Sequence, residues 1–308
     1  MALGQGGFAD DSAPADALVA IPDPSGGWVV AATVHEARKV AGKVQGRRST
    51  TELDYPLEVP AGDWAVRLRT TWVEPAYLET DASWCEPGGE PATPLGNGGA
   101  FGGKTGSMAP AVARRLADEH GRAVRVLLSR EDVVRLGPKR PPIAAGIRSD
   151  GTGVLRMART AGVAELVKAA APNLQVEQVG VHGPPTSESV RGAGWMEAMV
   201  LSAVARAGGS SKSRVVVKSP AGARAEASIA DDGRVRVRVE CGRILDDVVL
   251  KSYCTGAAHM ALGWVRSEGI ALDGHGQPCD LSIRSFGVLK AREMPEVEVH
   301  LVESDTTS

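Results

Sequence analysis

The feature that most constrains this chain is a glycine-rich loop, Gly98-Gly99-Ala100-Phe101-Gly102-Gly103-Lys104, in which four of seven residues are glycine. Glycine adopts positive φ at no steric cost and lets backbone N–H groups approach a ligand closely. Successive N–H groups in such a loop form a nest for an anion, and a helix that follows adds its N-terminal amides. A helix-periodic segment, residues 109–120, does follow and ends at Gly121, so we predict a ligand-binding loop before a helix.

Hydrophobic periodicity divides the rest of the chain into short strands and helices. Strands are predicted at residues 28–32, 63–72, 123–128, 281–286 and 297–302, with two or three antiparallel strands over 213–240. Helices are predicted at residues 34–44, after an N-cap at Ser129, and at 245–268, where a stripe that includes Met260 and Trp264 is expected to face a core. Asp150-Gly151 and Asp232-Gly233 predict hairpin turns. The mixture predicts an α+β fold of two mixed α/β regions with antiparallel and mixed sheets, residues 1–155 and 156–308.

Composition excludes several classes of function. The 308 residues carry 35 basic and 37 acidic side chains and only 4% aromatic residues, so neither charge nor stacking platforms indicate a nucleic-acid partner. No apolar run approaches the roughly 18 residues that span a bilayer, and the N-terminus does not resemble a secretory signal, so we expect no membrane partner and a cytoplasmic protein. The four cysteines lack metal-ligand spacing, and no histidine pair has helical ligand spacing; we predict no protein-ligated metal.

Several segments, in order, resemble the molybdopterin-binding subunits of the xanthine dehydrogenase and aldehyde oxidase family. The loop itself resembles the family's GG-x-FGGK string. The other segments that carry the resemblance are Tyr77-Leu78-Glu79-Thr80, residues 128–133, Gly137-Pro138-Lys139-Arg140-Pro141, Arg191-Gly192-Ala193-Gly194, and residues 256–295 with His259-Met260 and residues 280–286. Together they cover about half of the chain.

The resemblance implies a fold, a cofactor and partners. It implies domains similar to the molybdopterin-binding domains of molybdenum hydroxylases, and a molybdopterin cofactor in its molybdenum form, with or without cytosine dinucleotide. Carried over residue by residue, the cofactor contacts would be Gly98, Gly99, Ala100, Phe101, Gly102, Gly103, Arg191, Gly192, Ala193 and Gly194, and Phe101 and Arg140 would border a small-molecule substrate. The activity implied is hydroxylation of a heterocycle or aldehyde, with electrons passed to iron–sulfur and FAD subunits; a homodimer is an open alternative.

Departures from the family pattern keep other functions open. The family's chain continues into a G-x-G-E loop whose glutamate is the general base; the sequence here ends near Glu303 without that string, so we assign no catalytic residue. The chain is therefore also consistent with a catalytically inactive scaffold or interaction subunit. A surface position for Arg140, paired with Glu131 or Asp132, is an equal alternative to a pocket position. Finally, Gly98, Gly103, Lys104 and Thr105 satisfy the phosphate-loop string of nucleotide binders, although no apolar strand precedes them.

Overall fold

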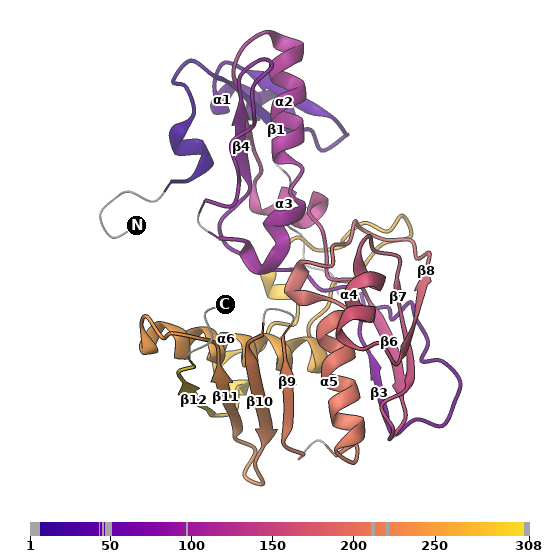
Figure 1. Cartoon of the computed structure of the whole chain (residues 1–308). Helices are drawn as coiled ribbons and strands as arrows, with labels where there is room; N and C mark the ends of the chain where they lie inside the picture. The colour runs from indigo at the N-terminus through magenta and orange to yellow at the C-terminus, as the bar shows by residue number, and fades with distance from the viewer. Residues whose placement is uncertain are drawn as a thin grey trace.

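A computed structural model describes residues 7–42, 44, 46, 51–96, 98–210, 213–219 and 222–304. Within them the chain forms three four-stranded sheets and six α-helices, and each sheet contains both parallel and antiparallel pairs. The predicted α+β class with mixed sheets is confirmed. Figure 1 shows one sheet with two helices at the top and two sheets side by side below it.

The N-terminal sheet has the order β2-β1-β5-β4, in which β1 and β5 are parallel. Its strands and helices are β1 (Leu18–Pro22), β2 (Trp28–Ala31), α1 (Val34–Ala41), β4 (Ala82–Cys85), α2 (Ala109–His120) and β5 (Val124–Leu127). Alanines of α2 pack on the sheet in a core with Leu116, Val124 and Val126. The predicted helix before Gly121 is confirmed, because Gly121 takes the left-handed conformation (φ 60°) that ends it. β1 lies in a segment for which the sequence predicted no element.

The central sheet has the order β3-β6-β7-β8. Its elements are β3 (Val66–Arg69), β6 (Ile143–Ile147), β7 (Gly153–Ala158), α4 (Val163–Ala170), β8 (Leu174–Val179) and α5 (Trp195–Arg206). The hairpin predicted at Asp150-Gly151 joins β6 to β7. The position predicted as a boundary, between residues 155 and 156, falls inside β7, which pairs with β6 and β8; the division into two regions stays a prediction.

The C-terminal sheet has the order β12-β11-β10-β9. Its elements are β9 (Val215–Lys218), β10 (Arg224–Ile229), β11 (Val235–Glu240), α6 (Asp247–Arg266) and β12 (Val297–Val302). The predicted hairpin at Asp232-Gly233 and the three antiparallel strands are confirmed. The predicted apolar stripe over residues 245–268 does not face a core along its whole length, because Leu245, just before α6, is 88% exposed and only Gly263 is buried within the helix.

The strand predicted at residues 281–286 is wrong. The segment contains a 3₁₀ turn, Ile283–Ser285, because the Asp280 carboxylate accepts hydrogen bonds from the Ser282 N–H (3.0 Å) and from Ser285 Oγ (2.7 Å). Aspartate side chains commonly bind nearby backbone in this way and so favour turns over strands.

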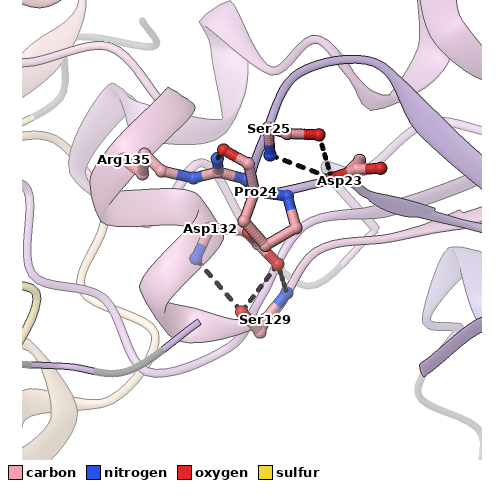
Figure 2. Close-up of polar contacts among 6 residues, drawn as sticks. All are labelled: Asp23, Pro24, Ser25, Ser129, Asp132 and Arg135. Carbon is pink, nitrogen blue, oxygen red and sulfur yellow. Dashed lines mark hydrogen bonds and ion pairs between the residues drawn. The ribbon is translucent and has the colours of Figure 1, made fainter. Parts of the chain in front are cut away.

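The helix predicted after Ser129 is α3 (Arg130–Leu136), which links the N-terminal sheet to the rest of the chain. Ser129 Oγ accepts from the Asp132 N–H (3.1 Å), and the Asp132 carboxylate accepts from the Ser129 N–H (3.1 Å), which completes a capping box. Arg135 then donates to the Pro24 carbonyl (3.2 Å) and lies 3.0 Å from Asp132, so α3 is fastened to the turn between β1 and β2 (Figure 2).

Candidate functional site

The glycine loop forms a distorted 3₁₀ segment, η2 (Ala100–Gly106), directly before α2. Its backbone turns through positive φ at Gly98 (110°), Ala100 (50°), Phe101 (57°) and Gly102 (87°). The Gly99 carbonyl accepts from the N–H groups of Gly102 (2.9 Å) and Lys104 (3.2 Å), which closes the turn. This geometry leaves the Phe101 side chain 50% exposed on the outside of the loop.

The glycine loop and the second predicted loop lie against each other. A Cβ atom on Gly102 would overlap the Ser189 carbonyl and lie 2.9 Å from the Val190 nitrogen. Ser189 and Val190 directly precede Arg191, which belongs to the 3₁₀ turn η3 (Val190–Gly192). The sequence resemblance predicted that these two loops share one site, and the structure brings them together.

A third segment, residues 74–77, completes the junction. A Cβ atom on Gly103 would lie 2.6 Å from Tyr77 Cε1 and 3.1 Å from Pro75 Cγ. Gly102 and Gly103 are therefore required by contacts within the protein. Gly98 has no atom within 4 Å of a Cβ position, and Gly99 has only the Gly102 nitrogen at 3.9 Å, so this half of the loop borders open space.

Backbone strain is concentrated at this junction. Among the described residues, four that are not glycine have positive φ: Ala76, Ala100, Phe101 and Arg191. All four belong to the three segments that meet here. Each such conformation costs on the order of 1–3 kcal/mol, and strain of this kind clusters at functional sites.

Lys104 points inward and is neutralised by a carboxylate. Its side chain is 2% exposed and forms an ion pair with Glu79. The Tyr77 ring lies 6.0 Å from Lys104 Nζ, and the Tyr77 hydroxyl donates to Asp81 Oδ1 (2.8 Å). Burial, followed by the nearby Asp81 carboxylate, raises the pKa of Tyr77. A phosphate-loop lysine must reach the phosphates of a nucleotide, so this geometry disfavours the nucleotide-binding alternative.

The second loop presents less accessible surface than the first. Ala193 and Gly194 are buried, and a Cβ atom on Gly194 would lie 2.6 Å from Val163 Cγ2. The Gly194 N–H donates to Glu197 Oε2 (2.9 Å). Gly192 is half-buried and has positive φ (59°), and a Cβ there would lie 2.5 Å from Met196 Sδ. Packing onto α4 and α5 therefore accounts for the glycines of this loop.

Beneath the two loops lies a set of buried charges that the sequence did not reveal. It consists of three ion pairs, Glu74–Lys139, Arg140–Glu197 and Arg191–Glu268, which we call the buried ion-pair cluster. Lys139 Nζ lies 3.0 Å from Glu74 Oε2, and Arg191 Nη1 lies 2.6 Å from Glu268 Oε2. Arg191 Nη2 also donates to the Glu74 carbonyl (3.3 Å). Burial raises the pKa of Glu74 and lowers that of Lys139.

Arg140 belongs to this cluster, so the surface position that we considered for it, paired with Glu131 or Asp132, is wrong. Its side chain is fully buried, pairs with Glu197, and stacks 4.2 Å from the centre of the Trp264 ring. Burial, together with the positive charge of Arg191, lowers the pKa of Arg140 to about 9. Within the described chain its Nε and Nη1 atoms have no hydrogen-bond partner.

The junction offers backbone amides and an aromatic ring rather than a free charge. Lys104, Arg140 and Arg191 are each paired with a carboxylate, although Arg191 Nε has no partner in the described structure. A cavity of about 330 Å³ lies beside the loop, with Lys104, Glu79 and Asp81 in its wall. In the described residues no group of three or more His, Cys, Asp or Glu side chains could hold a metal ion. No helix in that part of the chain is long and apolar enough to cross a membrane.

No protein-family model and no curated protein matches the chain. Among solved structures it is similar to quinoline 2-oxidoreductase from Pseudomonas putida 86, with a TM-score of 0.48 and 9% identity over 90% of this chain and 78% of that one. Aldehyde oxidoreductase from Desulfovibrio gigas gives a TM-score of 0.28 and 14% identity over 64% of this chain and 35% of that one. Reconstituted CO dehydrogenase from Oligotropha carboxidovorans gives a TM-score of 0.23 and 14% identity over 52% of this chain and 30% of that one. All three TM-scores lie below 0.5, so the similarities carry no functional conclusion.

Proposed function

We propose that this chain is the cofactor-binding subunit of an oxidoreductase of the molybdenum hydroxylase type, and that its two loops hold a molybdopterin. The observation that carries the proposal is the junction itself, where two loops nearly 90 residues apart meet and where the four strained non-glycine residues are concentrated. Strained backbone persists only where surrounding structure holds it, and it marks candidate ligand sites.

The accessible groups fit a flat, anionic cofactor. The Gly98 N–H already donates to the Leu95 carbonyl, so the open backbone of Gly99 to Phe101 would supply the N–H donors to phosphate or pterin oxygens. The Phe101 ring would cover a planar face or border the substrate. Arg191 is paired with Glu268, but its Nε has no partner in the described structure and would add a hydrogen-bond donor from beneath. When bound, the molybdenum cofactor would supply the redox centre for hydroxylation of a heterocycle or aldehyde, and iron–sulfur and FAD subunits would accept the electrons. The role of this chain would be to bind and orient the cofactor; we assign it no catalytic base.

Cofactor content is the direct test. The chain, co-expressed with iron–sulfur and flavin partner subunits in a host supplied with molybdate, is assayed for molybdenum by mass spectrometry and for pterin by fluorescence after oxidation. We expect both in the wild type and less of both in Phe101→Ala. Leu95→Ala is the matched control, because Leu95 is a similarly exposed apolar side chain just before the loop. Absence of molybdenum and pterin from the wild-type complex would overturn the proposal.

A second candidate function, an interaction subunit without cofactor, is favoured by the exposed first half of α6. Val248 and Tyr253 lie on this half and Leu245 lies just before the helix, and each of the three is more than two-thirds exposed. Exposed apolar side chains gathered on one helix indicate a contact surface. If this function is the true one, Leu245→Ser with Tyr253→Ser will release co-purified partner subunits from a complex that contains no pterin.

A further inference from the structure

A groove runs along one face of α5, separate from the loop junction. It consists of two cavities, of about 190 Å³ and about 270 Å³, that share Met199 and Val217 as wall residues. Figure 1 shows α5 lying beside β9 at the edge of the C-terminal sheet, where both cavities are formed. Ligand sites of proteins typically have volumes of this order.

One end of the groove is apolar. The smaller cavity is lined by Trp195, Met196 and Val200 of α5 and by Val217 and Val239 of the sheet. Ser219 and Arg224 also border it, but the surface that it exposes consists of apolar atoms. Apolar cavities of similar size bind small hydrocarbon groups. This end therefore suits an alkyl chain.

The other end is positively charged. The larger cavity is lined by Arg206, Lys218 and Asn173, and its lining contains no carboxylate. Within the described chain neither Arg206 nor Lys218 forms an ion pair, in contrast to the buried arginines of the loop junction. The Arg206 guanidinium packs on the Gly151 backbone, where an added Cβ would lie 2.5 Å from Nη1. Two uncompensated cations at one end of a groove favour an anionic group there.

Ser202 provides an independent sign that a ligand belongs at this end. It lines the larger cavity one helical turn before Arg206, is only 3% exposed, and its buried Oγ has no hydrogen-bond partner in the described structure. A serine inside a helix usually bonds to the carbonyl four residues earlier, and an unsatisfied buried hydroxyl costs free energy. A ligand oxygen would satisfy it.

We propose that this groove binds a linear amphipathic monocarboxylate of the medium-chain fatty acid type. The alkyl chain would lie along Trp195 to Met199, and the carboxylate would accept hydrogen bonds from Ser202 Oγ, Arg206 and Lys218. A linear molecule fits because the lining residues of α5 follow one helix face from Met196 to Arg206, a distance of about 15 Å at the helical rise of 1.5 Å per residue. The site is independent of the proposed cofactor.

Calorimetric titration of the full chain with decanoate, below its micelle concentration, tests the proposal, with decanol as the neutral analogue. We expect decanoate to bind at least about tenfold more tightly than decanol, since charge-assisted hydrogen bonds contribute this much or more. Arg206→Met and Lys218→Met will each weaken decanoate binding by a similar factor and leave decanol binding unchanged. Arg159→Met, the same change on an exposed arginine outside the groove, will alter neither. Equal binding of the two ligands, or binding of neither, overturns the proposal.

Ser202→Ala separates a ligand contact from a structural role. Because the hydroxyl has no partner in the free protein, its removal will leave the thermal midpoint unchanged or raise it, while decanoate affinity falls severalfold. A lower midpoint with unchanged affinity would show that the hydroxyl serves the fold and would contradict its place in the site.

Discussion

Substituting Gly102 by alanine tests whether the two loops truly pack against each other. The Cβ would overlap the Ser189 carbonyl and lie 2.9 Å from the Val190 nitrogen, and neither is a flexible side chain that can move aside. The residue would also occupy φ 87°, where an L-residue pays about 1–2 kcal/mol. Overpacking adds about 1–3 kcal/mol. We therefore expect Gly102→Ala to lower the free energy of unfolding by about 2–5 kcal/mol.

Gly121→Ala is the matched control, since Gly121 also has positive φ (60°) but no atom within 4 Å of the added Cβ. Gly121→Ala should lower the free energy of unfolding only by the cost of placing an L-residue at positive φ, about 1–2 kcal/mol. Urea unfolding followed by circular dichroism measures both, and amide hydrogen exchange should show faster opening of residues 98–104 and 187–194 in Gly102→Ala alone. If the two variants are equally stable and their amides in both loops exchange at the same rates, the loops are not in contact in solution and do not form one site.

Three further predictions concern elements around the site. Ser129→Ala removes the acceptor for the Asp132 N–H and should lower the stability of the chain to urea by about 1 kcal/mol; an unchanged midpoint would contradict the capping box. Glu79→Gln leaves the buried Lys104 cation without its carboxylate and should lower the free energy of unfolding by up to about 3 kcal/mol. The loss should be smaller than for a fully buried pair because Glu79 is partly exposed. Adding Lys104→Met to the same chain should recover most of it. Because the pKa of Tyr77 is raised in the folded state, the folded protein keeps the phenol proton at a pH where the unfolded chain releases it, near 10.0. The free energy of unfolding should therefore fall as the pH rises through that value. Tyr77→Phe should flatten this dependence in denaturation curves measured at several pH values.

Local signals allowed several elements to be predicted to within a few residues. Gly121 ends α2 because its left-handed backbone stops the helix, and Ser129 begins α3 because its hydroxyl replaces a missing backbone acceptor. The Asp-Gly turns at residues 150 and 232 set the register of two hairpins. Each of these rests on contacts within about four residues, which a sequence pattern records directly.

Other features depend on neighbours that are distant in sequence. The pairing of β1 with β5, and the assignment of β3 to a different sheet from β4, come from long-range packing that periodicity does not encode. The predicted stripe at residues 245–268 has a helical period, but the apolar side chains of its first half are exposed, so the periodicity wrongly predicted that they face a core. At residues 281–286 the side chain of Asp280 overrode an apolar pattern.

The candidate site divides in the same way. The glycine loop was recognisable because its composition is unusual, and its proximity to the Arg191 loop followed from the ordered resemblance. The buried ion-pair cluster could not be recognised from the sequence, because its residues come from four stretches of chain and charged side chains are normally expected at the surface. Of its members only Arg140 and Arg191 had been singled out, and the partner of Arg140, Glu197, lies on a helix for which no prediction was made.

The cluster also explains how the strain at the junction is held. Replacing buried ion pairs by well-packed apolar side chains is often neutral for stability, so three such pairs are not needed merely to hold a core together. The ion pairs do restrict the fold, because each cation must lie beside its own carboxylate or a buried charge is left uncompensated. Arg191 is both a member of the cluster and a strained residue, and Ala76 follows Glu74 by two positions. Releasing the positive φ at either place would pull a charge from its partner, so the ion pairs hold the loops in the conformation that presents Gly98 to Phe101 outward.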